Sequence, residues 1–147
     1  MTARKPVVYL AHPKGTYGSP FAKAQLAALV RQLPGWQVID PEAHGWTSDR
    51  EWLDAWPGIL GKLDALAVYG EHGTWTVGAG CFTEWHDATL NRLPLLGLDD
   101  DGALCELVAL APLSVEVRSM RRCARVMLGR RLSALDVAGI VREAVAA

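Results

Sequence analysis

The sequence has little cysteine and no long apolar segment, and each absence excludes a class of protein. Its three cysteines are Cys81, Cys105 and Cys123, an odd number without metal-ligand spacing, so we expect reduced, mostly packed thiols in a cytoplasmic protein. No apolar run approaches the roughly 20 residues that span a bilayer. The first residues also lack the apolar core of a signal peptide. We therefore expect no membrane partner.

An excess of charge of one sign is also missing. The chain has 15 Lys and Arg against 16 Asp and Glu, a formal net charge of −1, which makes a nucleic-acid partner unlikely on general electrostatic grounds. The local exception is the tail, 118–147, which we expect to be helical with a basic face. That face has three interpretations: a solvated helix surface, a phosphate or nucleic-acid contact, or a subunit interface. Its arginines are Arg118, Arg121, Arg122, Arg125, Arg130 and Arg131.

What the chain does have is a regular alternation of apolar runs with helical patterns. Its 147 residues, half of them hydrophobic, fit a single domain over 1–147 with one core. Strands are expected at 7–11, 36–41, 65–69, 95–98 and 113–117, and helices at 21–33, 49–63, 82–90 and 103–110. This order predicts an α/β fold: a flavodoxin- or Rossmann-like three-layer sandwich. Its mostly parallel five-stranded sheet would have the order 2-1-3-4-5, with a core of about 6–117 and a C-terminal helical tail.

Three serines are placed to begin helices. Ser19 precedes Pro20, a residue favoured at the first helical position. Ser48 and Ser133 are each followed three residues later by an acid, which is typical of a reciprocal helix cap. The second helix contains Pro57 followed by glycine, so we expect it to be kinked or broken there.

The stretch 77–84 links an apolar strand to a helix through glycines. Such a strand, loop and helix place N–H groups and one side chain at the carboxyl edge of a parallel sheet, where ligands bind in open α/β folds. Glu84 lies near the positive end of the helix dipole, which favours an ionised carboxylate suited to a nucleophile or base. The simpler interpretation is that Gly78 and Gly80 only permit a tight turn and that Glu84 is a favourable first-turn acid.

A second loop, 12–20, follows the first strand. Lys14 and the backbone at Gly15 could hold a phosphate just before a helix, but the P-loop pattern is missing, which excludes a nucleotide triphosphatase of that class. His12 titrates in the range useful for acid–base chemistry, or is simply solvated. Other polar residues follow the third strand, and they match no common ligand spacing: Glu71, His72, His86 and Asp87. We therefore predict neither a metal nor a cofactor.

Three motifs in register resemble the nucleoside 2-deoxyribosyltransferase-like superfamily, which includes deoxyribosyltransferases and nucleoside 5′-monophosphate N-glycosidases. The run 9–13, Tyr-Leu-Ala-His-Pro, resembles the family's Tyr-Leu-Ala-Gly-Pro. Asp64 opens an apolar strand, as an aspartate does in the family. Gly80 is followed by Glu84 and then Ala88, which resembles Gly-x-x-x-Glu-x-Gly-x-Ala. The resemblance covers about residues 6–117.

The resemblance implies cleavage or transfer at the N-glycosidic bond of a nucleoside or nucleotide. Glu84 would attack the anomeric carbon, Tyr9 would orient it or the sugar through a hydrogen bond, and Asp54 or His12 would supply a proton to the leaving base. The family commonly builds its sites between subunits, so a homo-oligomer is expected. Together with the loop analysis, this predicts a substrate-binding set of His12, Lys14, Gly15, Asp64, Thr76, Gly78 and Gly80.

Two departures from the family pattern leave other functions open. Trp56 occupies the position of the family's aspartate on the second helix, and the nearest acid, Asp54, is two residues away on nearly the opposite face. Gly78 replaces the serine of nucleotide-cleaving members, with Thr76 as the nearest hydroxyl. The alternatives are a catalytically inactive nucleotide-binding module of the same fold, or an interaction protein that uses the arginine-rich tail.

Overall fold

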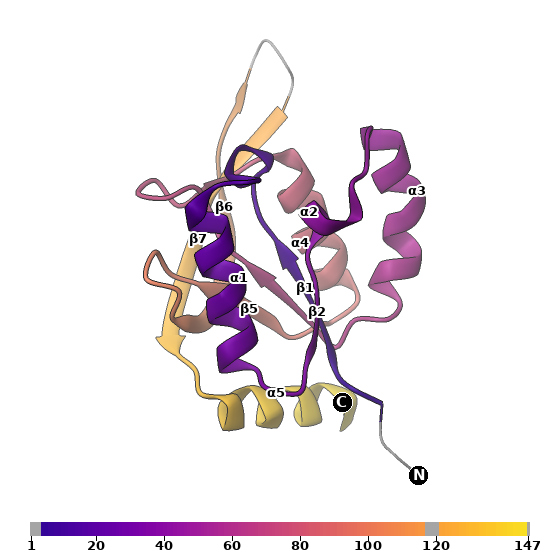
Figure 1. Cartoon of the computed structure of the whole chain (residues 1–147), viewed down its shortest axis with the longest axis vertical. Coiled ribbons are helices and arrows are strands. Elements are labelled where there is room, and N and C mark those ends of the chain that lie inside the picture. The colour runs from indigo at the N-terminus through magenta and orange to yellow at the C-terminus, as the bar shows by residue number, and fades with distance from the viewer. Residues whose placement is uncertain (1–3, 117–120, 147) are drawn as a thin grey trace.

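The computed structural model describes residues 4–116 and 121–146 and forms a mixed α/β fold (Figure 1). The first half contains β1 (Val7–Ala11), the 3-10 helix η1 (Lys14–Thr16), α1 (Pro20–Gln32), β2 (Gln37–Ile39), α2 (Pro41–His44), α3 (Asp49–Leu60) and β3 (Ala65–Val68). The second half contains β4 (Thr76–Val77), α4 (Ala79–Leu90), β5 (Leu95–Leu98), β6 (Leu104–Glu116), β7 (Arg121–Arg131) and α5 (Ala134–Ala146). Among the described residues, no helix is long and apolar enough to cross a membrane.

The strands form one sheet with the order β2-β1-β3-β5-β6-β7-β4. The four strands from β2 to β5 are parallel, and β6, β7 and β4 continue the sheet in antiparallel pairs. The prediction of a mostly parallel sheet of five strands is therefore wrong in size, since the described residues supply seven. Strands β1 and β3 are buried along their whole length, which explains their unbroken apolar runs.

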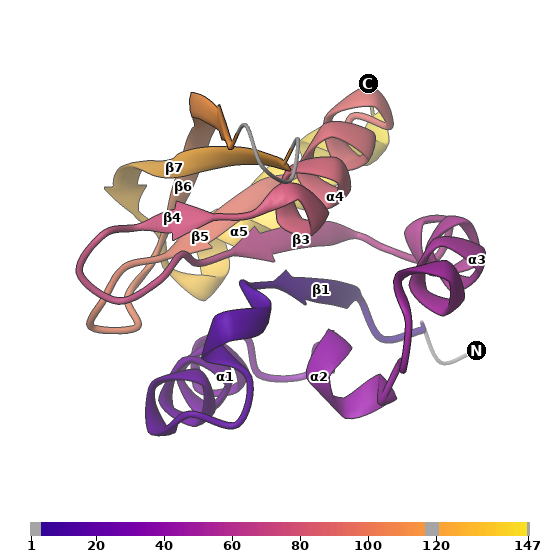
Figure 2. The same ribbon diagram turned by 90° about the horizontal axis from the view of Figure 1, so that it is seen from above.

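Helices cover both faces of the sheet. On one face, Trp56 of α3 and Ala88 of α4 pack against Tyr9 and Leu66. On the other face, Leu29 of α1 and the first turn of α5 pack against the alternate residues of β1 and β3. Seen from above, α1 and α4 lie on opposite sides of these two strands (Figure 2). The site described below lies on the α3 and α4 face.

The largest difference from the sequence prediction is a long antiparallel hairpin of β6 and β7. The helix expected over 103–110 is wrong, and so is the helical start of the tail. Register shifts in β6 bring both Leu107 and Leu110 into the core, so an irregular strand imitates helical spacing. In β7, buried Ala124 and Val126 alternate with exposed Arg125 and Met127, the period of a strand.

The expected basic helix face is therefore absent from the described part of the tail. Arg125, Arg130 and Arg131 lie exposed on β7, where Arg130 pairs with Glu106 and Arg131 approaches Asp99. Arg118 lies outside the described residues, as do the side chains at 121 and 122. These ion pairs join β7 to its neighbours and leave no continuous cationic helix for nucleic acid.

The predicted helix starts are confirmed. The Ser19 hydroxyl accepts the N–H of Ala22 at 3.0 Å, with Pro20 at the first helical position. The Ser133 hydroxyl accepts the Asp136 N–H, and the Asp136 carboxylate accepts the Ser133 N–H in return. The Ser48 hydroxyl likewise accepts the Glu51 N–H, but the Glu51 carboxylate accepts from Thr47 in place of Ser48. The expected break in the second helix is wrong: α3 continues through Pro57 and ends at Leu60. Pro57 has no N–H to donate, so one backbone hydrogen bond of the helix is missing at this position.

Candidate active site

Glu84 is the buried carboxyl of the α3 and α4 face. It lies in the second turn of α4 and is 4% exposed. The helix begins directly after Gly78, which offers no side-chain cap. Across the interface, the indole Nε1 of Trp52 donates to Glu84 Oε2 at 3.2 Å. A carboxyl removed from water needs such a donor, because burial without one is costly.

Trp52 and Trp56 form a matched pair with the two acids of α4. The indole Nε1 of Trp56 donates to Asp87 Oδ2 at 2.8 Å. The two indole rings stack with centroids 6.2 Å apart. Residues three or four apart lie on the same face of a helix. Trp52 and Trp56 therefore share one face of α3, and Glu84 and Asp87 share the face of α4 that meets it. This arrangement gives each acid one indole donor.

Tyr9 completes the group from the sheet. It is fully buried, and its ring meets Trp56 edge-on with centroids 5.0 Å apart. Its hydroxyl has no partner that satisfies hydrogen-bond geometry among the described residues. Burial, followed by the charge of neighbouring Glu84, raises the pKa of this hydroxyl far above its usual value. Tyr9 is therefore a neutral O–H donor beside Glu84, available to a ligand hydroxyl or to the carboxylate.

Burial has the largest effect on the pKa of Glu84. It raises the pKa of the carboxyl from 4.5 to about 7, although the nearby hydroxyl of Tyr9 and the N–H of Trp52 act to lower it. The nearby charge of Asp87 acts in the same direction as burial. The expectation that the position in the helix favours an ionised Glu84 is therefore wrong near neutral pH, because the loss of water outweighs the helix dipole. Near neutral pH the group exchanges a proton readily, a property of acid–base and nucleophilic carboxyls.

We expect this pKa to make the protein less stable as the pH rises. The folded carboxyl holds its proton up to about pH 7, whereas the unfolded one loses it near 4.5. Glu84 therefore makes its full contribution to the stability of the fold below pH 4.5. That contribution is lost between pH 4.5 and about pH 7, which lowers the free energy of unfolding by about 3 kcal/mol. Urea unfolding from pH 4.5 to 8 measures it as the difference between wild type and Glu84→Gln. A difference independent of pH would contradict the raised pKa.

Two predicted site acids lie away from this group. Asp54 is on the exposed side of α3, where its side chain is 69% exposed and pairs with Arg50 at 3.3 Å. Asp64 is at the amino end of β3, where its carboxylate accepts the Val7 N–H at 2.8 Å and both guanidinium nitrogens of Arg4 at 2.9 Å. A shallow pocket near Asp64 also lies at that amino end. Neither acid is placed to act on a ligand held by Glu84.

Two carboxylates lie against the loop 12–20, which was predicted to bind a phosphate. A side-chain carbon at Gly15 would lie 2.7 Å from Glu71 Oε1, and the Gly18 N–H donates to Glu42. Lys14 pairs with Asp49 at 2.6 Å on the surface. Two carboxylates against the loop repel a phosphate, so the described geometry does not favour the predicted role of Lys14 and Gly15 in phosphate binding.

The glycine loop before α4 is open. A side-chain carbon at Gly78 or Gly80 would meet no atom within 4 Å, so packing does not require glycine at either position. Thr76 lies in β4, and its hydroxyl pairs with that of Thr74 at 2.9 Å. The structure therefore leaves space above the start of α4, on the same helix as Glu84.

Sequence reasoning missed the part played by Trp52 and Asp87. Helical spacing was the available signal, since Trp52 and Trp56 are four residues apart and Glu84 and Asp87 are three apart. That spacing predicts a shared face on each helix. It does not predict that the two faces meet, which depends on how the helices pack on the sheet.

Fold and site together define a mixed α/β protein with a buried, readily protonated carboxyl held between two helices and a central strand. Comparisons of the chain with protein-family models, curated proteins and solved structures found no match. The geometry around Glu84 is therefore the basis for assigning a function.

Proposed function

We propose that the protein cleaves or transfers the N-glycosidic bond of a nucleoside or nucleotide, with Glu84 as the attacking carboxylate. The observation that carries this proposal is a buried carboxyl with a pKa of about 7, held by Trp52 and lying beside the unpartnered hydroxyl of Tyr9. A sugar hydroxyl could satisfy Tyr9 while the carboxylate faces the anomeric carbon. The motif resemblance places a catalytic glutamate at the same position.

The proposed reaction has two steps. An oxygen of ionised Glu84 bonds to the anomeric carbon as the carbon–nitrogen bond breaks, and the electron pair of that bond leaves with the base. The departing base takes up a proton from water. Water or a second base then attacks the glycosyl-enzyme ester and releases Glu84. Trp52 and Tyr9 orient the carboxylate through their N–H and O–H donors.

The parallel arrangement of β2, β1, β3 and β5 is compatible with a flavodoxin-like domain of the deoxyribosyltransferase-like superfamily. We extend the proposal to that assignment and, following the resemblance, to a cytoplasmic homo-oligomer. The first β-to-α loop and the glycine loop before α4 would then contribute to one ligand site at the carboxyl ends of the strands.

A second candidate is a nucleotide-binding module without turnover. The observation that favours it is Trp56, which takes the place of the family's aspartate and uses its N–H on Asp87. With that aspartate replaced, the fold would bind a ligand without supplying the proton that the leaving base needs.

Base release distinguishes the two candidates. The pure protein is incubated with a panel of nucleosides and 5′-monophosphates, with and without a free acceptor base, and the products are separated by chromatography. We expect free base without acceptor for a hydrolase and a new nucleoside only with acceptor for a transferase. Saturable binding by calorimetry without any product would instead support the binding module.

A further inference from the structure

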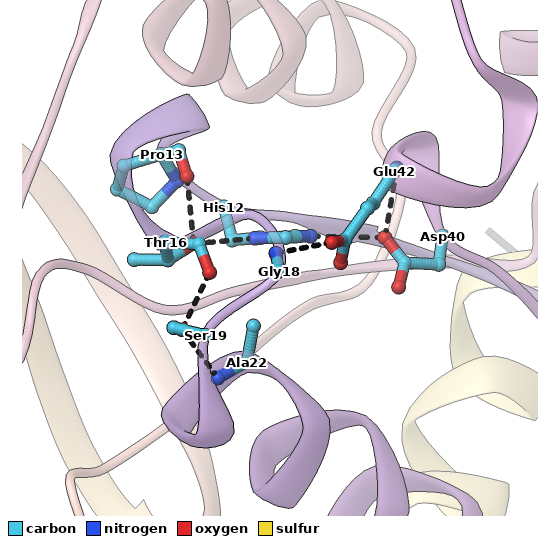
Figure 3. Close-up of polar contacts among 8 residues, drawn as sticks. All are labelled: His12, Pro13, Thr16, Gly18, Ser19, Ala22, Asp40 and Glu42. Carbon is cyan, nitrogen blue, oxygen red and sulfur yellow. Dashed lines mark hydrogen bonds and ion pairs between the residues drawn. The ribbon is translucent and has the colours of Figure 1, made fainter.

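A second polar cluster lies at the carboxyl ends of β1 and β2 (Figure 3). His12 directly follows β1, Asp40 directly follows β2, and Glu42 lies in the first turn of α2. One ligand-type atom from each of these three side chains lies within 4.8 Å of the other two. The cluster is separate from the interface that holds Glu84, and neither the proposed reaction nor the sequence motifs assign it a role as a unit.

The hydrogen bonds of His12 determine which ring nitrogen carries the proton. The Thr16 hydroxyl has a single hydrogen, and it points to the carbonyl of Pro13 at 2.6 Å. Thr16 Oγ1 must therefore accept from His12 Nδ1, which lies 2.7 Å away. In the neutral ring, His12 Nε2 then carries only a lone pair. That lone pair points at the Asp40 carboxylate, 2.9 Å away.

Two acceptors facing each other need either a proton or a metal ion between them. The Glu42 carboxylate adds a second negative charge in the same place, so the unbound cluster carries two carboxylates and one lone pair. A single proton on Nε2 can satisfy only part of this set. A divalent cation satisfies all three groups.

The groups that surround His12, Asp40 and Glu42 hold these side chains in the way that metal ligands are usually held. The side chain of His12 is fully buried, and its ring is packed against Tyr69 at 4.9 Å and Tyr17 at 4.7 Å between centroids. A histidine that ligates a metal usually donates its other N–H to a neighbouring acceptor, as Nδ1 does here to Thr16. Asp40 is held by the Glu42 N–H at 3.0 Å, and Glu42 accepts from the Gly18 N–H. His12 and Glu42 are thus oriented by partners outside the set, and Asp40 by the backbone of Glu42.

The spacing of two of the ligand atoms, His12 Nε2 and Asp40 Oδ1, also fits a metal site, and the Glu42 atom lies within 4.8 Å of both. Bonds of about 2.0–2.2 Å to a metal place neighbouring ligand atoms about 3 Å apart in an octahedral site and slightly further apart in a tetrahedral one. The Nε2–Oδ1 separation of 2.9 Å is close to the octahedral value. A site of one imidazole and two carboxylates suits Zn²⁺ or Mn²⁺ better than Ca²⁺, which prefers oxygen alone.

We propose that His12 Nε2, Asp40 and Glu42 bind a divalent transition metal, with the remaining coordination positions open to water or a ligand. Sequence spacing predicted no metal, because 28 residues separate His12 from Asp40 and no short motif spans them. The ring of Tyr17 packs on His12.

Calorimetry on the untagged, chelator-treated chain tests the proposal directly. Zn²⁺ and Mn²⁺ are titrated separately at pH 7.5, and we expect one saturable site per chain for at least one of them. The variants His12→Gln, Asp40→Asn and Glu42→Gln should each weaken that binding at least about tenfold. Glu71→Gln is the control, since Glu71 lies against the same loop but outside the three ligands.

Urea unfolding without metal establishes whether each variant is folded. In a folded protein, unchanged affinity in all three ligand variants would overturn the proposal, as would the absence of saturable binding to the wild type. Nitrogen chemical shifts of His12 provide an independent test. Protons on both ring nitrogens in the presence of excess Zn²⁺ and Mn²⁺ would show a simple ion pair with Asp40 and exclude the metal.

Discussion

Replacing Glu84 with glutamine is expected to lower the rate of base release at least about a thousandfold while the fold is retained. Glutamine has the same size, and its amide oxygen can still accept the Trp52 N–H, which approaches Oε2 at 3.2 Å in the wild type. It cannot supply the negative charge that bonds to the anomeric carbon. The measurement is the turnover number with the best substrate of the panel, together with ligand affinity by calorimetry.

Glu143→Gln serves as the control for this experiment. Glu143 is exposed on α5, which packs against the opposite face of the sheet from Glu84. We expect its turnover and stability to match the wild type. A Glu84→Gln variant that binds ligand and turns over within tenfold of the wild type would remove Glu84 from the proposed chemistry.

Truncating Trp56 to alanine is expected to reduce the free energy of unfolding by about 3–5 kcal/mol. Trp56 is 3% exposed and packs edge-on against Tyr9, so its loss leaves a cavity between α3 and the sheet. It also removes the N–H that Asp87 accepts at 2.8 Å, leaving that half-buried carboxylate without its indole donor. Urea unfolding with a two-state fit measures the change.

Two further variants separate packing from hydrogen bonding. Trp56→Phe keeps an aromatic ring against Tyr9 but loses the N–H, so we expect a smaller cost of about 1–2 kcal/mol. Leu53→Ala is the control on the same helix, since Leu53 is 51% exposed and should cost well under about 1 kcal/mol. A Trp56→Ala cost as small as that of Leu53→Ala would contradict the packing of α3 described here.

These predictions bear on Trp56, the position at which the resemblance noted in the sequence would place an aspartate. In this chain the position is used to pack against Tyr9 and to hold Asp87, and the exposed neighbour Asp54 pairs with Arg50. If base release is detected, Asp87 is the acid to test next as the proton donor. If binding occurs without release, the proposal of a binding module with Trp56 in place of a second carboxyl is supported.

The fold was predictable from the sequence where the signals are local. Strands β1, β3 and β5 are short apolar runs with breaks on either side, and the caps at Ser19 and Ser133 act within one helical turn. Both kinds of signal act over a few neighbouring residues. The prediction failed in the hairpin of β6 and β7, where register shifts place Leu107 and Leu110 together in the core. A register shift interrupts the alternation of buried and exposed side chains along a strand, so the sequence pattern no longer indicates a strand. Only the pairing with its partner strand then defines it.

The sequence by itself determined that this is an α/β chain and that Glu84 follows a glycine loop at the start of a helix. Only the tertiary structure decided that Trp52 and Trp56 meet Glu84 and Asp87, that Asp54 points to solvent, and that His12 faces Asp40. The physical reason is distance along the chain: these partners are separated by about 30 residues, and their contact depends on how whole helices pack on the sheet. The pKa of Glu84 follows from the same packing, because burial between α3, α4 and β1 outweighs the local helix dipole.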